Sequence, residues 1–489
     1  MHRLFESNAV LSCLVKRSKL LIMSKFKPKN YENLTIVDMA EKGIGVAKTE
    51  TGEVIFVEKA VPGDIVNVYS PKKVKGTRRG VVSEFIKYSD DRVEPFCKHF
   101  GTCGGCTYQH LDYSAQLKVK EKMVSDALIR IAGIAPETIE TILPAPATQY
   151  YRNKLDFAAS KLRWLTPEEI NTTEKFEHNV IGFHKPGVFD KILPIDHCYL
   201  QADPSNQLRL SMFATATEQS ITFYNNKTHQ GLLRGLIIRS TTAGQIMVIV
   251  VFGEDNPKAI KSLLDAWIAV NAEITSVYYC INTKLNDYYG DLDMVLYQGA
   301  EVITELLGAL SFRIGPKSFF QTNAIQAKRL YDVVLSYCGF HGNENVYDLY
   351  TGTGSIALYI AKYCMSITGI EEVVDAIRDA NINAATNHVL NATFYAGDTK
   401  DVLSETFVSR HGKPDVVITD PPRSGMHPDV IKTLLQLEAP KIVYVSCNPS
   451  TQARDIKMLS DKYKVEKIKP VDMFPHTYHI ESVALLLLK

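Results

Sequence analysis

The C-terminal part of the chain, from about residue 313, alternates short apolar runs with amphipathic stretches. The apolar runs carry few charges, as in "NVYDLY" at residues 345–350 and "KIVYVSC" at residues 441–447. Continuous apolar strands that alternate with helices are typical of a parallel sheet covered by helices on both faces. Such a sheet binds its ligands at the carboxyl ends of its strands. The polar residues that follow these strands are therefore the first candidates for a functional site.

The length of 489 residues is too great for one hydrophobic core and indicates about three domains. We predict a small β-barrel over residues 29–90, a central α+β domain over residues 91–310 and an α/β domain over residues 311–489. Residues 1–28 lack the order of a secretory signal, and we expect them to be a disordered extension.

Composition restricts where the protein works and what it binds. The net charge is +1, so a nucleic-acid-binding surface has to be a local patch. Nine cysteines in a chain of this length do not indicate a disulfide framework, so we expect a reducing, cytoplasmic environment. No stretch approaches the roughly 20 apolar residues of a membrane span, and we expect no membrane partner.

Residues 30–90 alternate apolar and polar positions and contain frequent glycine and proline, which is typical of a small all-β barrel. The barrel contains a basic loop, "PKKVKGTRRG". This loop is either a solvated hairpin tip or a phosphate-binding element. Its candidate RNA-binding residues are Lys72, Lys73, Lys75, Arg78 and Arg79.

The turn after the first strand of the C-terminal sheet, "DLYTGTGS", places Gly352 and Gly354 where a ligand can approach the backbone. The second strand ends at Glu371 and the third at Asp398, positions from which acids can contact a ribose and an adenine. The chain lacks the glycine patterns of dinucleotide and ATP sites. These features favour S-adenosylmethionine, and the alternative is an α/β domain with helix-capping acids.

Cys447 ends the fifth strand, on the ligand side of the predicted sheet. A free cysteine is usually a buried apolar residue, and that interpretation suits Cys280, Cys338 and Cys364. At a strand end Cys447 can instead be a nucleophile. Methyl transfer to carbon-5 of a pyrimidine needs one, because thiolate addition to carbon-6 makes carbon-5 nucleophilic. The same reaction then needs a general base to remove the carbon-5 proton.

Several motifs together resemble the RNA uracil-C5 methyltransferases, in order and in spacing over nearly the whole chain. They are "SFFQTN", "DLYTGTGS", "DPPRSG", "SCNP" and "DMFPHTYHIESVALL". The resemblance implies a Rossmann-like class I S-adenosylmethionine methyltransferase domain, and the N-terminal barrel resembles an oligonucleotide-binding-like TRAM domain. One departure is Arg423 in "DPPR", where some relatives have another residue.

The resemblance also implies roles for single residues. Cys447 falls on the nucleophile and Glu481 on the general base. The cofactor contacts that it implies are Gln321, Tyr350, Glu371, Asp398 and Asp420.

Three cysteines lie close together in "FCKHFGTCGGCTYQH" at Cys97, Cys103 and Cys106. Their spacing alone allows a metal-cluster site, a zinc site or a redox pair. The resemblance adds Cys198 from "PIDHCYL" and implies a [4Fe–4S] cluster held by the four thiolates.

The function that follows is methylation of a uridine in RNA, with 23S rRNA before ribosome assembly is complete as the expected substrate and a monomer as the expected state. A tRNA T-loop uridine is the alternative target. An amino-group methyltransferase would leave Cys447 without a role. A non-catalytic, cluster-bearing RNA-binding protein would not need Gln321, Asp420, Cys447 and Glu481 together.

Overall fold

A computed structural model describes residues 28–74, 76–172 and 176–489. Nearly all of the predicted N-terminal extension, and Lys75 of the basic loop, lie outside the described residues. The chain forms two compact units. The first contains the described residues up to 94 together with residues 110–115, and the second contains residues 95–109 and 116–489.

The first unit is a closed barrel of five strands in the order β1-β2-β3-β5-β4, which confirms the prediction of an all-β barrel. Closure leaves no unpaired strand edge. The strands are β1 (Lys29–Ala40), β2 (Ile44–Lys48), β3 (Val54–Glu58), β4 (Ile65–Val74) and β5 (Thr77–Lys87), and β1 is followed by the short helix η1 (Glu41–Gly43). Apolar side chains that alternate along these strands, such as Ile55 and Val57, fill the barrel.

The second unit begins with the cysteine-rich stretch. The helix α2 (Tyr113–Ala127), whose first residues belong to the first unit, follows it and continues into the short π-helix η2 (Leu128–Ala132). A seven-stranded sheet follows in the order β12-β11-β10-β9-β6-β7-β8. Its strands are β6 (Lys154–Ser160), β7 (Val180–His184), β8 (Ile192–Pro194), β9 (Leu233–Ser240), β10 (Ile246–Phe252), β11 (Ser276–Ile281) and β12 (Val295–Gly299). The helices among them are α4 (Ser205–Glu218) and α5 (Pro257–Ala269). The short helix η3 (Pro136–Thr138) precedes β6 in the chain, and the short helix α3 (Pro167–Ile170) lies between β6 and β7.

A hairpin and a helix lead into the C-terminal sheet. They are β13 (Ile303–Leu307), β14 (Leu310–Ile314) and α6 (Ala324–Cys338). The predicted boundary between residues 310 and 311 falls at the start of β14, and that division stays a prediction.

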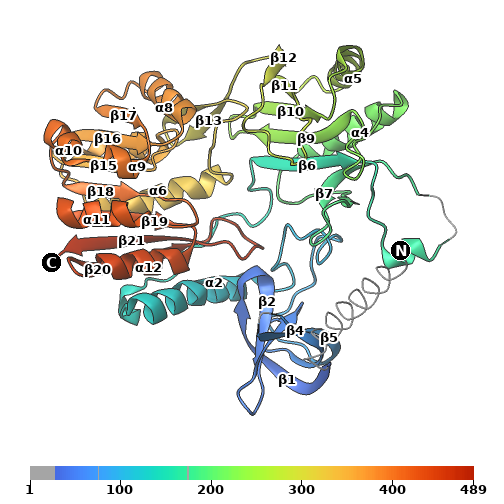
Figure 1. Cartoon of the computed structure of the whole chain (residues 1–489), viewed down its shortest axis with the longest axis horizontal. Helices are drawn as coiled ribbons and strands as arrows, with labels where there is room; N and C mark the ends of the chain where they lie inside the picture. Colours follow the sequence, from blue (N-terminus) through green and yellow to red (C-terminus); the bar gives the residue numbers. More distant parts are fainter. Residues whose placement is uncertain (1–27, 75, 173–175) are drawn as a thin grey trace, which may run out of the picture. The chain divides into compact units, whose positions relative to one another are not determined.

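The C-terminal sheet has seven strands in the order β17-β16-β15-β18-β19-β21-β20 (Figure 1). The first five strands in this order are parallel to one another, as predicted. β21 runs antiparallel to both of its neighbours, β19 and β20. The strands are β15 (Asn345–Leu349), β16 (Ser366–Glu371), β17 (Ala392–Ala396), β18 (Val416–Thr419), β19 (Lys441–Ser446), β20 (Tyr463–Val471) and β21 (Glu481–Leu488). The helices are α7 (Ser355–Ile360), η4 (Ala361–Tyr363), α8 (Val374–Thr386), α9 (Thr399–Val402), α10 (Glu405–His411), α11 (Pro428–Leu437) and α12 (Pro449–Leu459).

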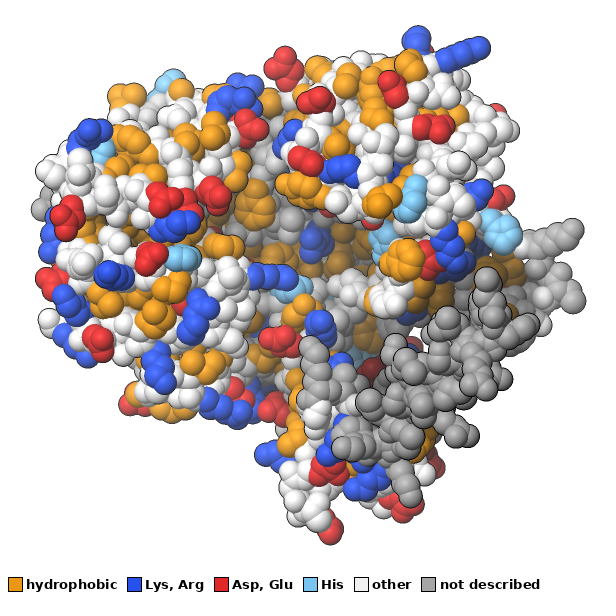
Figure 2. All heavy atoms as spheres, viewed as in Figure 1, with side chains coloured by type: hydrophobic (Ala, Val, Ile, Leu, Met, Phe, Trp, Pro, Cys, Tyr) orange, Lys and Arg blue, Asp and Glu red, His pale blue; other side chains and the backbone are white. Residues whose placement is uncertain are grey.

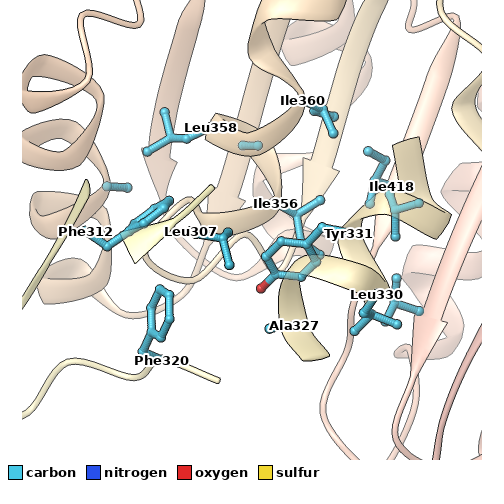
Figure 3. Packing of buried hydrophobic residues seen from close by; sticks show 14 of the residues in the cluster. Leu307, Phe312, Phe320, Ala327, Leu330, Tyr331, Ile356, Leu358, Ile360 and Ile418 are labelled. Carbon is cyan, nitrogen blue, oxygen red and sulfur yellow. The ribbon is translucent and has the colours of Figure 1, made fainter. Parts of the chain in front are cut away.

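Both faces of this sheet are buried, which explains why its strands lack polar alternation. Val346 packs in one core with α6 and α7, and its neighbour Tyr347 packs in another with α11 and α12. Figure 3 shows part of the first core, where Tyr331 lies beside Ile356 of α7 and Leu307 lies between these two residues and Phe312. The two cores hold the strand ends at a fixed edge, where the site lies.

Candidate active site

The carboxyl ends of the parallel strands line one large cavity of about 1290 Å³. All seven residues predicted to bind the cofactor or carry out the chemistry line it: Gln321, Tyr350, Glu371, Asp398, Asp420, Cys447 and Glu481. Residues that lie up to 160 positions apart in the sequence are therefore brought to one cavity by the strand order. Size and lining suit a nucleoside ligand together with a second group.

The turn after β15 is shaped for close approach of a ligand. Tyr350 has φ 62° and Gly352 has φ 59°, both in the left-handed region. A Cβ atom added to Gly352 would meet nothing within 4 Å, so the backbone there faces open space. Gly354 has φ 77°, and a Cβ there would lie 3.0 Å from Phe394 Cζ. The two glycines thus serve different needs: room for a ligand and packing against the sheet.

Two of the predicted cofactor acids already have partners. Glu371 accepts hydrogen bonds from the backbone N–H groups of Gly352 at 3.1 Å and Val373 at 2.9 Å. Asp398 caps α9 by accepting from Lys400 N–H at 3.1 Å and also pairs with Lys400 Nζ at 2.6 Å. The helix-capping interpretation therefore holds for Asp398, although its side chain still lines the cavity.

Strand register places the two predicted catalytic residues side by side. β19 and β21 are antiparallel, and Ser446 pairs with Ser482. Cys447 follows Ser446 and Glu481 precedes Ser482. Both residues therefore lie just beyond the last β19–β21 pair, at the same edge of the sheet. Glu481 is only 6% exposed. A thiol and a carboxyl group thus line one cavity from adjacent strands, which is the pair of groups that the predicted chemistry at carbon-5 requires.

Acidic groups dominate the electrostatics of the cavity. Burial, with a contribution from Asp420, holds the pKa of Glu481 well above its usual range. Burial and the neighbouring Asp348 raise the pKa of Asp420 to about 7, and burial raises that of Asp348 to about 7. Asp348 Oδ1 is buried and has no hydrogen-bond partner in the described parts of the chain. A cation in this cavity would relieve the mutual repulsion of these carboxyl groups.

The surroundings in the cavity also determine the protonation of the Cys447 thiol. Burial, followed by the nearby Glu481 and Asp420 carboxyls, raises the pKa of Cys447 to about 11. Arg423 opposes this effect, and its guanidinium lies 3.1 Å from His479 Nδ1. Burial and the Arg423 charge lower the pKa of His479 to about 4, so this histidine is neutral at pH 7.

The four predicted cluster cysteines line a second cavity of about 570 Å³. Cys97, Cys103, Cys106 and Cys198 are all free. Gly104 has φ 79°, and a Cβ there would lie 2.2 Å from Pro186 Cγ, so "CGGC" needs a glycine at this point. Among the described residues, no three His, Cys, Asp or Glu side chains form a group that could hold a single metal ion.

The surroundings of this cavity contain one feature that opposes negative charge, the burial of the thiols, and one that favours it, a buried cation. Burial raises the pKa of Cys103 to about 11 and of Cys106 to about 12. Arg209 is 2% exposed and donates to the Asp196 backbone carbonyl at 3.0 Å. No carboxylate of the described residues forms an ion pair with Arg209, and burial lowers its pKa to about 10. A buried guanidinium beside Cys198 therefore has thiolates as its available counter-charge.

Comparison with known proteins decides the family. Residues 302–489 match a family described as tRNA (Uracil-5-)-methyltransferase. The chain is 47% identical over 455 residues to an uncharacterized RNA methyltransferase of Bacteroides thetaiotaomicron, a match that covers 92% of this chain and 100% of that protein. An uncharacterized RNA methyltransferase of Porphyromonas gingivalis is 45% identical over 461 residues, 93% of this chain and 99% of that protein. The chain belongs to the RNA uracil-C5 methyltransferase family.

A solved structure supports this membership over most of the chain. The tRNA (uracil-54, C5)-methyltransferase of Pyrococcus abyssi, in complex with S-adenosyl-L-homocysteine, superposes with a TM-score of 0.72 at 31% identity and covers 93% of this chain and 100% of its own. The uracil-C5 methyltransferase described here is thus an S-adenosylmethionine-dependent enzyme with a class I fold and an N-terminal barrel. The described residues contain no helix that is long and apolar enough to cross a membrane.

The cavity of about 1290 Å³ at the strand ends is called the methyltransferase cavity below. Three further residues that line it were not among the predicted site residues: Asp348, Arg423 and Phe474. The strand-end position of Asp348 was a usable signal, because it resembles that of Glu371. Arg423 follows the "DPP" motif directly. Phe474 lies in the motif "DMFPHTYHIESVALL", but its place at the cavity could not be predicted, because the sequence does not reveal how the two flanking strands pair.

Proposed function

We propose that this enzyme transfers the methyl group of S-adenosylmethionine to carbon-5 of a uridine in RNA through a covalent Cys447 adduct. The observation that carries this proposal is the register of β19 and β21, which puts Cys447 beside Glu481 at the cavity edge. An amino-group methyltransferase would need neither residue.

The residues present fit the methyl donor. Its positive sulfonium suits a cavity where Asp348, Asp420 and Glu481 repel one another. Gln321, Tyr350, Glu371, Asp398 and Asp420 would hold it. When bound, S-adenosylmethionine supplies a methyl group that a carbon nucleophile can take.

The chain's own residues supply the covalent steps. The Cys447 thiol first loses its proton to solvent. The resulting thiolate adds to carbon-6 of the uracil, and the electron pair of the double bond becomes available at carbon-5. After carbon-5 has gained the methyl group, the ionised Glu481 takes the carbon-5 proton. The electrons of that bond re-form the ring double bond and expel the Cys447 thiolate, so the enzyme is regenerated. The uridine has to leave its stack to reach this buried pair.

Binding of S-adenosylmethionine should weaken as pH falls from 8 to 6. Asp348 and Asp420 have pKa values of about 7 in the ligand-free enzyme, and a cationic ligand favours their ionised forms. Protonation below pH 7 therefore opposes binding, by up to about tenfold per pH unit for each proton. Calorimetry at both pH values measures the change, and Asp420→Asn should lower the affinity and flatten the pH dependence. An affinity that stays constant between pH 6 and 8 would contradict this electrostatic assignment.

We propose 23S rRNA as the substrate, methylated before ribosome assembly is complete. A tRNA T-loop uridine is the second candidate, favoured by the similarity to a tRNA (uracil-54, C5)-methyltransferase. Mapping of 5-methyluridine in 23S rRNA and tRNA from a strain that lacks this gene distinguishes the two, because the modification should disappear from one RNA only.

We propose that the four cysteines hold a [4Fe–4S] cluster. One cavity that all four thiols line, together with the buried cation Arg209, supports a site for bound thiolates. A single zinc ion needs four ligands within about 2.3 Å of one centre, whereas the irons of a cluster take one thiolate each. The described residues contain no group of side chains arranged for a single metal ion, and this finding does not argue for zinc over a cluster.

The barrel is proposed to bind RNA through the β4–β5 hairpin. In the backbone register of this hairpin, Lys72 lies opposite Arg79 and Lys73 lies opposite Arg78. Lys73 Nζ and Arg78 Nε each lie 3.5 Å from a Glu53 carboxylate oxygen, so part of the basic charge is already balanced. On the face shown in Figure 2, Lys and Arg are interspersed with Asp and Glu. Because charges of both signs alternate on this face, phosphate groups need a local basic element such as the β4–β5 hairpin to bind to.

Neutralising the hairpin should weaken RNA binding and reduce its salt dependence. The variant replaces Lys72, Lys73, Lys75, Arg78 and Arg79 with glutamine. Each lost phosphate contact should lower the slope of log affinity against log salt by about 0.7 to 0.9. The control replaces exposed barrel lysines elsewhere, namely Lys42, Lys48, Lys59 and Lys87. Affinity for S-adenosylmethionine should stay unchanged, and an unchanged salt slope would refute the role of the hairpin.

A further inference from the structure

The stretch between β20 and β21, residues 472–480, leads directly into Glu481. We call it the β20–β21 turn. Phe474 and His479 of this turn line the methyltransferase cavity. His476 has φ 63°, a left-handed conformation that is uncommon for a bulky residue, and it is 7% exposed. A strained, buried backbone persists only where its surroundings hold it firmly.

The cysteine-rich stretch holds the centre of this turn. The N–H groups of Thr107 and Tyr108 both donate to the His476 carbonyl, at 2.8 and 3.0 Å. Both residues immediately follow the "CGGC" run that ends at Cys106. Cys97, at the start of the same stretch, donates its N–H to Gln109 Oε1 at 3.2 Å.

Gln116 joins the same two segments with its side chain. Its Nε2 donates to the Tyr108 carbonyl at 3.1 Å and lies 3.1 Å from His476 Nδ1. Its Oε1 accepts the His476 N–H at 3.0 Å. Gln116 is completely buried. Burial lowers the pKa of His476 to about 4, so its neutral ring can accept from Gln116 through Nδ1.

Neighbouring carbonyls of the turn are fixed in the same way. Asn323 Nδ2 donates to the Met473 carbonyl at 2.9 Å, Lys120 Nζ to that of Phe474 at 2.9 Å, and Tyr151 Oη to that of Pro475 at 3.0 Å. With His476, the carbonyls of residues 473–476 each accept a hydrogen bond from outside the turn. The fully buried Lys120 also pairs with Asp472 Oδ1 at 2.6 Å. This density of anchors exceeds what a loop needs merely to connect two strands.

We propose that Gln116 is a positioning residue for the general base: with residues 107–108 it fixes the β20–β21 turn, and thereby the place of Glu481 opposite Cys447. This inference rests on the proposed function, in which Glu481 removes the carbon-5 proton. It gives the cysteine-rich stretch a part in the chemistry although none of its thiols lines the methyltransferase cavity. The coupling runs through hydrogen bonds of this chain's own residues.

The test compares Gln116→Leu with a matched variant. Asn345→Leu also removes a buried amide that makes several backbone hydrogen bonds, but at the amino end of β15, away from the cavity edge. Gln116→Leu should lower kcat by about 100-fold, because small displacements of a catalytic group cost about that much. The RNA KM and the affinity for S-adenosylmethionine should change less than about twofold. Asn345→Leu should lose comparable thermal stability and keep its kcat.

Two further readouts separate positioning from general stability. Deuterium uptake by the peptide 472–480 should rise in Gln116→Leu and not in Asn345→Leu. An RNA–protein adduct that survives denaturing gels should accumulate in Gln116→Leu, because the base is displaced after Cys447 has reacted. Tyr151→Phe removes one hydroxyl and retains the ring, so it should fold and show smaller changes in the same directions.

The proposal is overturned if Gln116→Leu keeps its kcat within twofold of the parent enzyme, or if Asn345→Leu loses as much. If Gln116→Leu does not fold, unchanged uptake and kcat in Tyr151→Phe overturn it. A parent enzyme that methylates no RNA would refute the proposed function instead, and the deuterium uptake of peptide 472–480 would still show whether Gln116 holds the turn.

Discussion

Glu481→Gln should accumulate an RNA–protein adduct that survives denaturing gels, while its turnover falls by about 10² to 10⁴-fold. In the proposed mechanism the base acts only after Cys447 has bonded to carbon-6 and carbon-5 has been methylated. Without a carboxylate at this position the carbon-5 proton stays, and the thiolate cannot be expelled. Cys447→Ala should form no adduct and no product, because the first bond cannot form. Gel analysis with labelled RNA measures both outcomes.

Glu466→Gln on β20 is a suitable control, since it removes an acid from the neighbouring strand without touching the cavity. An adduct-free Glu481→Gln enzyme with near-normal turnover would assign the base to another residue. His479 would be tested next, because it lines the cavity. His476 would follow, although its Nδ1 is engaged by Gln116.

Cys198→Ala should lose bound iron and sulfide, together with much of the folded yield. Cys198 comes from the stretch before α4, whereas the other three thiols come from residues 97–106, so a group bound to all four would link two distant segments. Without that link the buried Arg209 would lose its anionic neighbour as well. Iron and sulfide analysis of protein purified without air measures the loss, and the parent protein should be brown.

Cys364→Ala is the matched control, because Cys364 is a buried thiol of the C-terminal domain that donates to backbone carbonyls. It should keep full iron content. Stoichiometric zinc in an anaerobic preparation of the parent protein would contradict the cluster assignment.

The fold of the C-terminal sheet could be predicted where physics is local. Unbroken apolar strands require two covered faces, and Val346 and Tyr347 indeed pack into opposite cores. Ligands bind at the carboxyl ends of parallel strands, and Glu371, Asp398 and Asp420 indeed line one cavity there. Cys447 lines the same cavity for the same reason, because it directly follows the parallel strand β19.

Other features depend on contacts distant in sequence and could not be predicted from local pattern. The pairing of Ser446 with Ser482 is a matter of register between antiparallel strands, and only that register puts Glu481 beside Cys447. The contact of Gln116 with His476 joins residues 360 positions apart. The sharing of Glu53 by Lys73 and Arg78 likewise appears only when β3 meets the β4–β5 hairpin.

The most direct test of uridine C5 methylation is to incubate the purified enzyme with rRNA and tRNA lacking this modification and with S-adenosylmethionine carrying a labelled methyl group. The RNA is then digested to nucleosides and separated by mass. All of the label should appear in 5-methyluridine, and Cys447→Ala should leave the RNA unlabelled. Label in a methylated adenosine, guanosine or cytidine, or equal labelling by Cys447→Ala, would contradict the proposed chemistry.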